Sequence, residues 1–165
     1  MYIAFENIPN HSRIWVYQSS RVFSSDEQKG IAQLLENFIN QWDTHGTALK
    51  GSFEIIKDRF IILAVDQEHH APSGCSIDKS VAIIKAIEEQ LNVQLFSRTE
   101  VAVETNNGLE IIPMMGLKKA VEDGLISSET PVYDNTIQNV AQYREEWPKA
   151  LNNTWLKRYL PKAVQ

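Results

Sequence analysis

The pattern of apolar and polar residues in the first half of the chain predicts a strand followed by a helix. Residues 13–20 (RIWVYQSS) are rich in β-branched and aromatic side chains and end in polar turn formers, which is typical of a β-strand. Ser24 and Glu27 then have the spacing of a helix capping box. Apolar residues recur every three or four positions from there to Trp42, so we expect an amphipathic helix with Gly46 as its C-terminal stop.

Two hairpins and a second helix are expected next. The segments LKGSFEII and RFIILAVD flank Lys57-Asp58 and predict two antiparallel strands, of which the second is apolar throughout its middle and should be central in a sheet. Residues 77–91 carry apolar side chains on one helical face, and Asn92 is expected to end that helix. The segments TEVAVET and LEIIP, joined across Asn107-Gly108, predict a final hairpin.

The order of these elements is strand, helix, strand, strand, helix, strand and an added edge strand. This is the βαββαβ order of a ferredoxin-like two-layer sandwich, so we expect an α+β core over residues 1–113. Helical patterns at residues 116–126, at 135–147 and after Pro148 predict a C-terminal helical extension over residues 114–165. We expect this extension to pack on the core within one domain, held by Trp147, Trp155 and Tyr159.

Composition indicates a soluble, cytoplasmic protein. The single cysteine cannot form an internal disulfide, and the first residues lack the basic and apolar segments of a secretory signal. The apolar runs are far shorter than the ~20 residues of a membrane helix. The 16 basic and 21 acidic residues give a net charge of −5 without a basic block, which weighs against nucleic-acid binding.

The ferredoxin-like order would gather the chemically active side chains at one end of the core. In that fold, the end of the third strand lies beside the start of the first strand, the loop before the second strand and the end of the fourth. These positions include all four histidines and the only cysteine. The residues expected there are His11, Arg13, Asp43, His45, Asp66, His69, His70, Cys75 and Glu104.

The segment after Asp66 resembles a phosphate-binding loop only in part. A Walker A loop has two glycines and a following Lys-Ser or Lys-Thr, which let the backbone wrap around the phosphates. Here Gly74 precedes Lys79-Ser80 with one residue too few and without a second glycine. The sequence therefore argues against ATP hydrolysis.

A metal site is the second interpretation of this segment. Imidazole, thiolate and carboxylate groups suit zinc, and His45, with His69 or His70, Cys75 and Asp66, could supply four ligands. Their spacing matches no zinc-finger signature, however, and adjacent histidines seldom serve one ion. We therefore expect solvated loop histidines, with no metal ligands and no cofactor.

The third interpretation is a reactive thiol. Cys75 is expected at a helix N-terminus, where free N–H groups and the helix dipole stabilise a thiolate. Ser73, Gly74 and Ser76 could donate to an anion, with His45 as base and Asp66 orienting it. The alternative is that Cys75 is a small apolar residue packed under the helix, while the serines cap it and Asp78 complements the dipole.

Several segments carry a resemblance to a known family. They are RIWVYQSSRVF, FINQWDTHG, LKGSFEII, RFIILAVD, SGCSID and NTWLKRYL. With them the chain resembles a family of small bacterial proteins that often bears the label "ABC transporter ATPase", and SGCSID is the most specific of the matches. The resemblance implies no activity, substrate or cofactor. The shared positions are Arg21, Phe23, Trp42, His45, Gly46, Asp66, Ser73, Gly74, Cys75, Ser76 and Asp78, whereas His69-His70 departs from the pattern.

Two functional hypotheses follow. The first is an enzyme or binding protein for a small molecule or anion, with Cys75 as nucleophile or anion-facing thiol and Arg13 as a cation at the same end of the core. The second is a non-catalytic interaction or oligomerisation module, including a homodimer, because open ferredoxin-like sheets often pair at their edges or faces. The sequence favours neither strongly enough to exclude the other.

Overall fold

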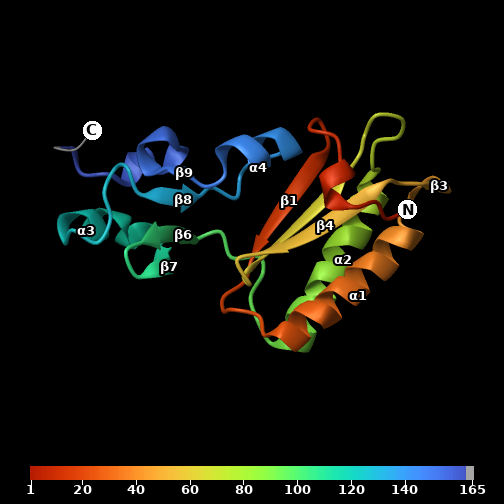
Figure 1. Ribbon diagram of the computed structural model, residues 1–165, viewed down its shortest axis with the longest axis horizontal. Helices are drawn as coiled ribbons and strands as arrows, with labels where there is room; N and C mark the ends of the chain where they lie inside the picture. The colour runs from red at the N-terminus through yellow and green to blue at the C-terminus, as the bar shows by residue number, and fades with distance from the viewer. Residues whose placement is uncertain (163–165) are drawn as a thin grey trace. The chain divides into compact units, whose positions relative to one another are not determined.

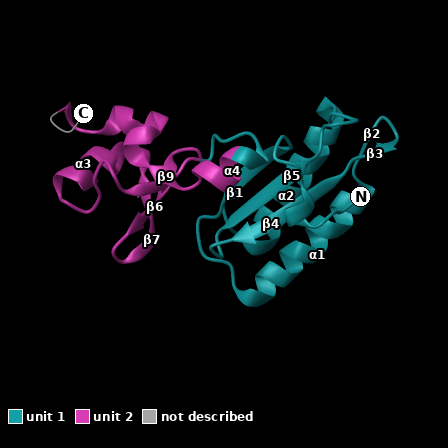
Figure 2. Cartoon of the chain, turned by 45° about the horizontal axis from the view of Figure 1, so that its top comes forward, with its two compact units in different colours: residues 1–96, 135–141 teal, residues 97–134, 142–165 magenta. Residues whose placement is uncertain are grey.

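The protein is an α+β protein with small antiparallel sheets (Figure 1). The computed structural model describes residues 1–162. The chain divides into two compact units (Figure 2). Unit 1 comprises residues 1–96 and 135–141, and unit 2 comprises residues 97–134 and 142–165. Among the described helices, none has the length and apolarity to cross a membrane.

Unit 1 contains a three-stranded antiparallel sheet covered on one face by two helices (Figure 1). The strand order is β1-β5-β4, so the apolar strand β5 is central as the sequence predicts. Every residue of β5 is buried. The elements of this unit are η1 (Phe5–Asn7), β1 (Arg13–Gln18), α1 (Ser25–Gln41), β2 (Asp43–Thr44), β3 (Thr47–Ala48), β4 (Gly51–Ile56), β5 (Phe60–Val65) and α2 (Gly74–Leu91).

Both predicted helices of unit 1 begin as the sequence indicates, and α2 also ends as expected. The first helix ends earlier than predicted, at Gln41, and the expected stop, Gly46, lies in the turn between β2 and β3. The Ser24 hydroxyl accepts from the Glu27 N–H at 3.1 Å, and the Glu27 carboxylate accepts from the Ser24 N–H at 2.9 Å, which completes the expected capping box. Asn92 ends α2 in the left-handed conformation, with φ 52°. The hairpin between β4 and β5 also forms, with Lys57 and Asp58 both at positive φ as a type I′ turn requires.

The hydrogen bonds of Glu27 predict how the stability of the folded protein depends on pH. Its carboxylate accepts two hydrogen bonds of 2.8 Å from the Arg21 guanidinium. These bonds, with the one from the Ser24 backbone, lower the pKa of Glu27 from 4.5 to about 2. Because the folded-state pKa lies below the ordinary value, the stabilisation is complete above pH 4.5 and is lost as the pH falls toward 2.

We therefore expect the wild type to lose more thermal stability than Glu27→Gln on acidification. Unfolding midpoints of both proteins, measured from neutral pH to about pH 2, should converge at the acid end. A difference between the midpoints that stays constant over this range would contradict the prediction.

The expected fourth strand of a ferredoxin-like core does not pair with β1. β6 (Glu100–Thr105) pairs instead with β7 (Gly108–Pro113) and β8 (Pro131–Tyr133), in a sheet of order β7-β6-β8-β9 within unit 2. The outer edge of β1 is met by a segment from late in the chain: the Ile14 N–H donates to the Gln138 carbonyl at 3.0 Å. The predicted pairing of the fourth strand with β1 is therefore wrong. The order of elements along the chain does not show which later segment will cover a given strand edge.

The C-terminal part of the chain is less helical than the sequence predicts. The predicted helices at residues 116–126 and 135–147 are confirmed in shorter form, as α3 (Leu117–Glu122) and α4 (Val140–Glu146). The helix expected after Pro148 is replaced by β9 (Lys149–Ala150) and the 3-10 turns η3 (Leu151–Asn153) and η4 (Trp155–Tyr159). The boundary expected near residue 113 falls inside unit 2, between β7 and η2 (Met114–Gly116).

Candidate functional site

Asp66 is the most constrained polar residue at the end of β5. Asp66 is 8% exposed, and its N–H donates to the Lys50 carbonyl at 2.9 Å. One carboxylate oxygen, Oδ1, accepts from the Glu68 N–H at 2.9 Å and lies 3.2 Å from Nε2 of His11. A largely buried carboxylate is therefore held in place by backbone and imidazole donors together.

The pair formed by His11 and Asp66 can take part in acid–base chemistry. An ionised carboxylate only accepts hydrogen bonds, so the bond to Asp66 places a proton on Nε2 of His11. In the neutral imidazole the second ring nitrogen, Nδ1, is then a hydrogen-bond acceptor. The His11 side chain is 55% exposed, so a bound molecule could reach it.

Metal-ligating groups also meet at this point. Ligand atoms of His11, Asp66 and Glu68 lie within 4.8 Å of one another, and Nε2 of His69 is 4.0 Å from the Glu68 carboxylate. Imidazole with carboxylates suits Mn²⁺, Fe²⁺ or Zn²⁺. A cation would have to displace the hydrogen bond between His11 and Asp66, however. The group that the structure assembles differs from the set expected around His45 and Cys75.

A pocket of about 330 Å³ lies beside Asp66. Its lining combines one carboxylate with three basic side chains. The lining residues are Thr47, Ala48, Leu49, Lys50, Asp66, His69 and His70. Both members of the adjacent histidine pair thus face one cavity, although adjacent residues seldom do so.

The first turn of α2 uses most of its own hydrogen-bonding groups. Ser73 and Ser76 cap each other: the Ser76 N–H donates to the Ser73 hydroxyl at 3.2 Å and the Ser73 N–H to the Ser76 hydroxyl at 3.3 Å. The Ser76 hydroxyl donates in turn to the Asp43 carbonyl at 2.7 Å. Within residues 1–162, only the N–H groups of Gly74 and Cys75 are left without an acceptor in this turn.

Cys75 is exposed, so the interpretation of it as an apolar residue packed under the helix is wrong. Helix α2 turns Ser76 and Ser80 toward the core, which directs Cys75 to solvent. His45 lies on the exposed turn between β2 and β3 at φ 49°. In the described part of the chain, its side chain hydrogen-bonds to neither Cys75 nor Asp66, and Asp66 orients His11 instead.

Three further residues considered in the sequence analysis lie elsewhere or have other contacts. Asp78 is exposed on α2, and the Arg13 guanidinium lies 4.9 Å from the centre of the Trp15 ring. Glu104 belongs to β6 in unit 2, where its carboxylate accepts the Tyr133 hydroxyl. None of the three lines the pocket beside Asp66.

Asp43 joins the hairpin of β2 and β3 to α2. The Lys79 ammonium lies 2.7 Å from its carboxylate, and this hydrogen bond, with one from the Gly46 N–H, lowers the pKa of Asp43. The side-chain carboxylate thus carries its charge at neutral pH beside a matched cation. The contact fixes the hairpin, whose second strand lines the pocket, against the first turns of α2.

Sequence reasoning missed Lys50 and Glu68. Lys50 is the second residue of the strand predicted from LKGSFEII, and Glu68 lies two residues after Asp66, so both positions were visible but carried no motif. The pairing of Lys50 with Asp66 across the strands became apparent only from the register of β4 and β5. His11 was expected at this end, but without its role as partner of Asp66.

Comparison of the chain with known protein families, with curated proteins and with solved structures finds no match. The family resemblance drawn from the sequence therefore stays a hypothesis. Any function has to be argued from the residues themselves.

Proposed function

We propose that the chain binds a small anionic molecule in the pocket beside Asp66 and that His11 and Asp66 act there as an acid–base pair. The observation that carries the proposal is the position of Asp66. This carboxylate is 8% exposed, is bonded to His11, and lines the same pocket as Lys50, His69 and His70. Such convergence of charged groups on a concave surface is typical of ligand sites.

The charges of the lining favour an anion. Lys50 supplies an ammonium group, and His69 and His70 supply imidazole N–H donors. The negative charge of Asp66 is partly compensated by its two donors, His11 and the Glu68 N–H. The free N–H groups of Gly74 and Cys75, a few residues along the same loop, would add a favourable field for negative charge.

Cys75 is the group that would distinguish an enzyme from a binding protein. Its thiol is exposed and is not part of a disulfide. In a catalytic form of the proposal, Sγ of Cys75 would bond to the bound molecule as the bond to a leaving group breaks, and His11 would take the thiol proton and pass it to that leaving group. Binding itself requires only the pocket, so loss of the thiol should leave affinity for an anion nearly unchanged.

Titration with inorganic phosphate and with citrate tests the proposal. We expect saturable shifts of the backbone amide resonances of Lys50, His69 and His70 in two-dimensional NMR spectra. Lys50→Ala should weaken binding about tenfold, which corresponds to the loss of roughly one charged hydrogen bond. Lys85→Ala, which removes the same charge from an exposed position in the middle of α2, should bind as the wild type does.

Two results would overturn the proposal. One is the absence of saturable shifts with either anion, or an equal loss of affinity in Lys50→Ala and Lys85→Ala. The other is that Mn²⁺ selectively broadens the resonances of His11, Asp66 and Glu68 while neither phosphate nor citrate binds. This result would assign the site to a cation.

The alternative of an interaction module rests on β4, the edge strand of unit 1, whose first residue, Gly51, is bridged by Tyr2. The sheet order leaves β4 as an edge strand, with Phe53 and Ile55 half-buried. We propose that unit 1 is a ferredoxin-like core without its fourth strand, because its elements follow the order βαββα with strands arranged β1-β5-β4. Pairing of two β4 edges would give a homodimer, which light scattering of the purified protein detects directly. A cytoplasmic location stays a prediction.

A further inference from the structure

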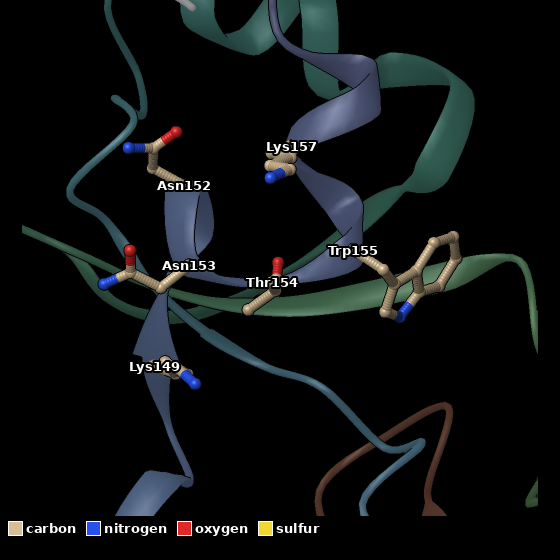
Figure 3. Close-up of a pocket in the computed structure, with 6 residues that line it drawn as sticks. All are labelled: Lys149, Asn152, Asn153, Thr154, Trp155 and Lys157. Atoms are coloured by element: carbon tan, nitrogen blue, oxygen red, sulfur yellow. The ribbon is translucent and has the colours of Figure 1, made fainter.

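A second pocket, of about 530 Å³, lies within unit 2 (Figure 3). It is formed where β9, η3 and η4 follow one another in the chain. Two asparagine carboxamides lie on one side and the Trp155 ring on the other, with a lysine above and a lysine below Thr154 in this view. The lining residues are Lys149, Asn152, Asn153, Thr154, Trp155 and Lys157.

The floor of this pocket is built from bonded backbone. The Thr154 hydroxyl donates to the Leu151 carbonyl at 2.8 Å and accepts from the Leu156 N–H at 3.2 Å, which ties η3 to η4. The Asn152 N–H donates to the Ser128 carbonyl at 2.8 Å, and Lys149 pairs with Val132 of β8. The side chains that line the pocket are therefore carried by a fixed frame rather than by a free loop.

Trp155 offers a flat apolar surface in this frame. Trp155 is 40% exposed, although the sequence predicted that this side chain would pack against the core. The indole N–H donates to the Asp134 carboxylate at 3.2 Å, and Tyr159 meets the ring edge to face at 6.3 Å between centroids. An aromatic side chain held in this way and left open to solvent is a platform for the apolar face of a ligand.

The polar lining selects the rest of the ligand. No lining residue is acidic, and Lys149 and Lys157 supply two ammonium groups in a chain whose net charge is −5. Lys149 is only loosely engaged by Glu146, at 3.5 Å. The carboxamides of Asn152 and Asn153 each both donate and accept, which suits hydroxyl groups.

We propose that this pocket binds a monosaccharide that carries an anionic group, as a sugar phosphate or a uronate does. The C–H face of the sugar ring would lie on Trp155, its hydroxyls would meet Asn152 and Asn153, and its anionic group would be bound by Lys149 and Lys157. A neutral sugar would leave both lysines unused, and a bare anion would leave the indole unused. The inference concerns unit 2 and does not depend on the function proposed for unit 1.

Titration with glucose 6-phosphate is the test, followed through the indole N–H resonance of Trp155. We expect saturable shifts of this resonance. Glucose and inorganic phosphate should each bind at least about tenfold more weakly, because each lacks one of the two recognised groups. Glucuronate reports on whether a carboxylate replaces the phosphate. If glucuronate binds as tightly as glucose 6-phosphate, the pocket recognises anionic sugars in general. If glucuronate binds more weakly, the pocket recognises sugar phosphates.

Variants separate the contributions of charge and ring. Affinities of the variants are measured by isothermal titration calorimetry, because Trp155→Ala removes the indole resonance. Lys157→Ala should weaken glucose 6-phosphate binding about tenfold, and Trp155→Ala should do so at least as much. Lys118→Ala, on the exposed face of α3, removes the same charge outside the pocket and should have no effect. Any one of three results would overturn the inference. They are equal affinities of the wild type for glucose 6-phosphate and inorganic phosphate, an unchanged affinity of Trp155→Ala for glucose 6-phosphate, and no saturation of the Trp155 resonance in the wild type.

Discussion

Replacing Trp42 by alanine is expected to lower the free energy of unfolding by about 3–5 kcal/mol, the cost of removing a large aromatic side chain from a core. Trp42 is 1% exposed and stands directly after α1. Its ring centroid is 5.1 Å from that of Phe38 and 6.3 Å from that of Trp15, so its loss would leave a cavity between α1 and the sheet. Chemical denaturation followed by circular dichroism measures the effect.

Trp42→Phe separates the packing from the hydrogen bond. The Trp42 indole N–H donates to the Ser76 carbonyl at 2.9 Å and so joins the end of α1 to the first turn of α2. Phenylalanine keeps most of the ring volume but loses this donor, so we expect a smaller cost of about 1–3 kcal/mol. The amide resonances of Gly74 and Cys75 should shift in both variants. An alanine variant that is no less stable than the phenylalanine variant would contradict this account.

The local elements of unit 1 could be predicted because their signals are local. The capping box at Ser24, the apolar run of β5 and the left-handed end of α2 at Asn92 are each encoded within a few residues, and all three are confirmed. The partner of β6 could not be predicted in the same way. Its pairing with β8 depends on a strand of three residues whose sequence, Pro-Val-Tyr, carries almost no periodic signal.

The candidate site shows the same division between local and distant information. The sequence drew attention to Asp66 and to the start of α2, because an acidic residue after a buried strand and a serine cap are both local patterns. It paired Asp66 with His45, whereas the folded chain brings His11 to Asp66 from 55 residues away. The contact depends on the antiparallel register of β1 and β5, in which Arg13 pairs with Val65. No spacing rule within either segment contains that register.

Trp155 illustrates a different limit. Aromatic residues in a C-terminal segment are usually core residues, and Trp147, which is 8% exposed, follows that rule. The 3-10 turn η4 rotates Trp155 outward while it buries Leu156, which is 2% exposed. A regular α-helix from Pro148 would have distributed the same residues over other faces. The prediction failed because the type of helix, and with it the residue period, was assigned wrongly.

Leu151→Ala is expected to destabilise unit 2 by about 2–5 kcal/mol, the range found for fully buried leucines. Leu151 is 0% exposed and packs in the cluster that contains Val103 and Val132. Its N–H donates to the Thr130 carbonyl at 2.9 Å, so it also connects η3 to the segment before β8. Hydrogen exchange of the backbone amides in β6 and β8 measures the loss locally, through faster exchange at Val103 and Val132.

Leu125→Ala provides the matched control for this effect. Leu125 belongs to the same unit but is 44% exposed, so its truncation should change stability by less than about 0.5 kcal/mol. Because η3 carries Asn152 and Asn153, Leu151→Ala should also weaken glucose 6-phosphate binding in the pocket of unit 2, whereas Leu125→Ala should not. Equal exchange rates in the two variants would mean that Leu151 does not anchor this part of the sheet, and the fixed frame inferred for the pocket would then be wrong.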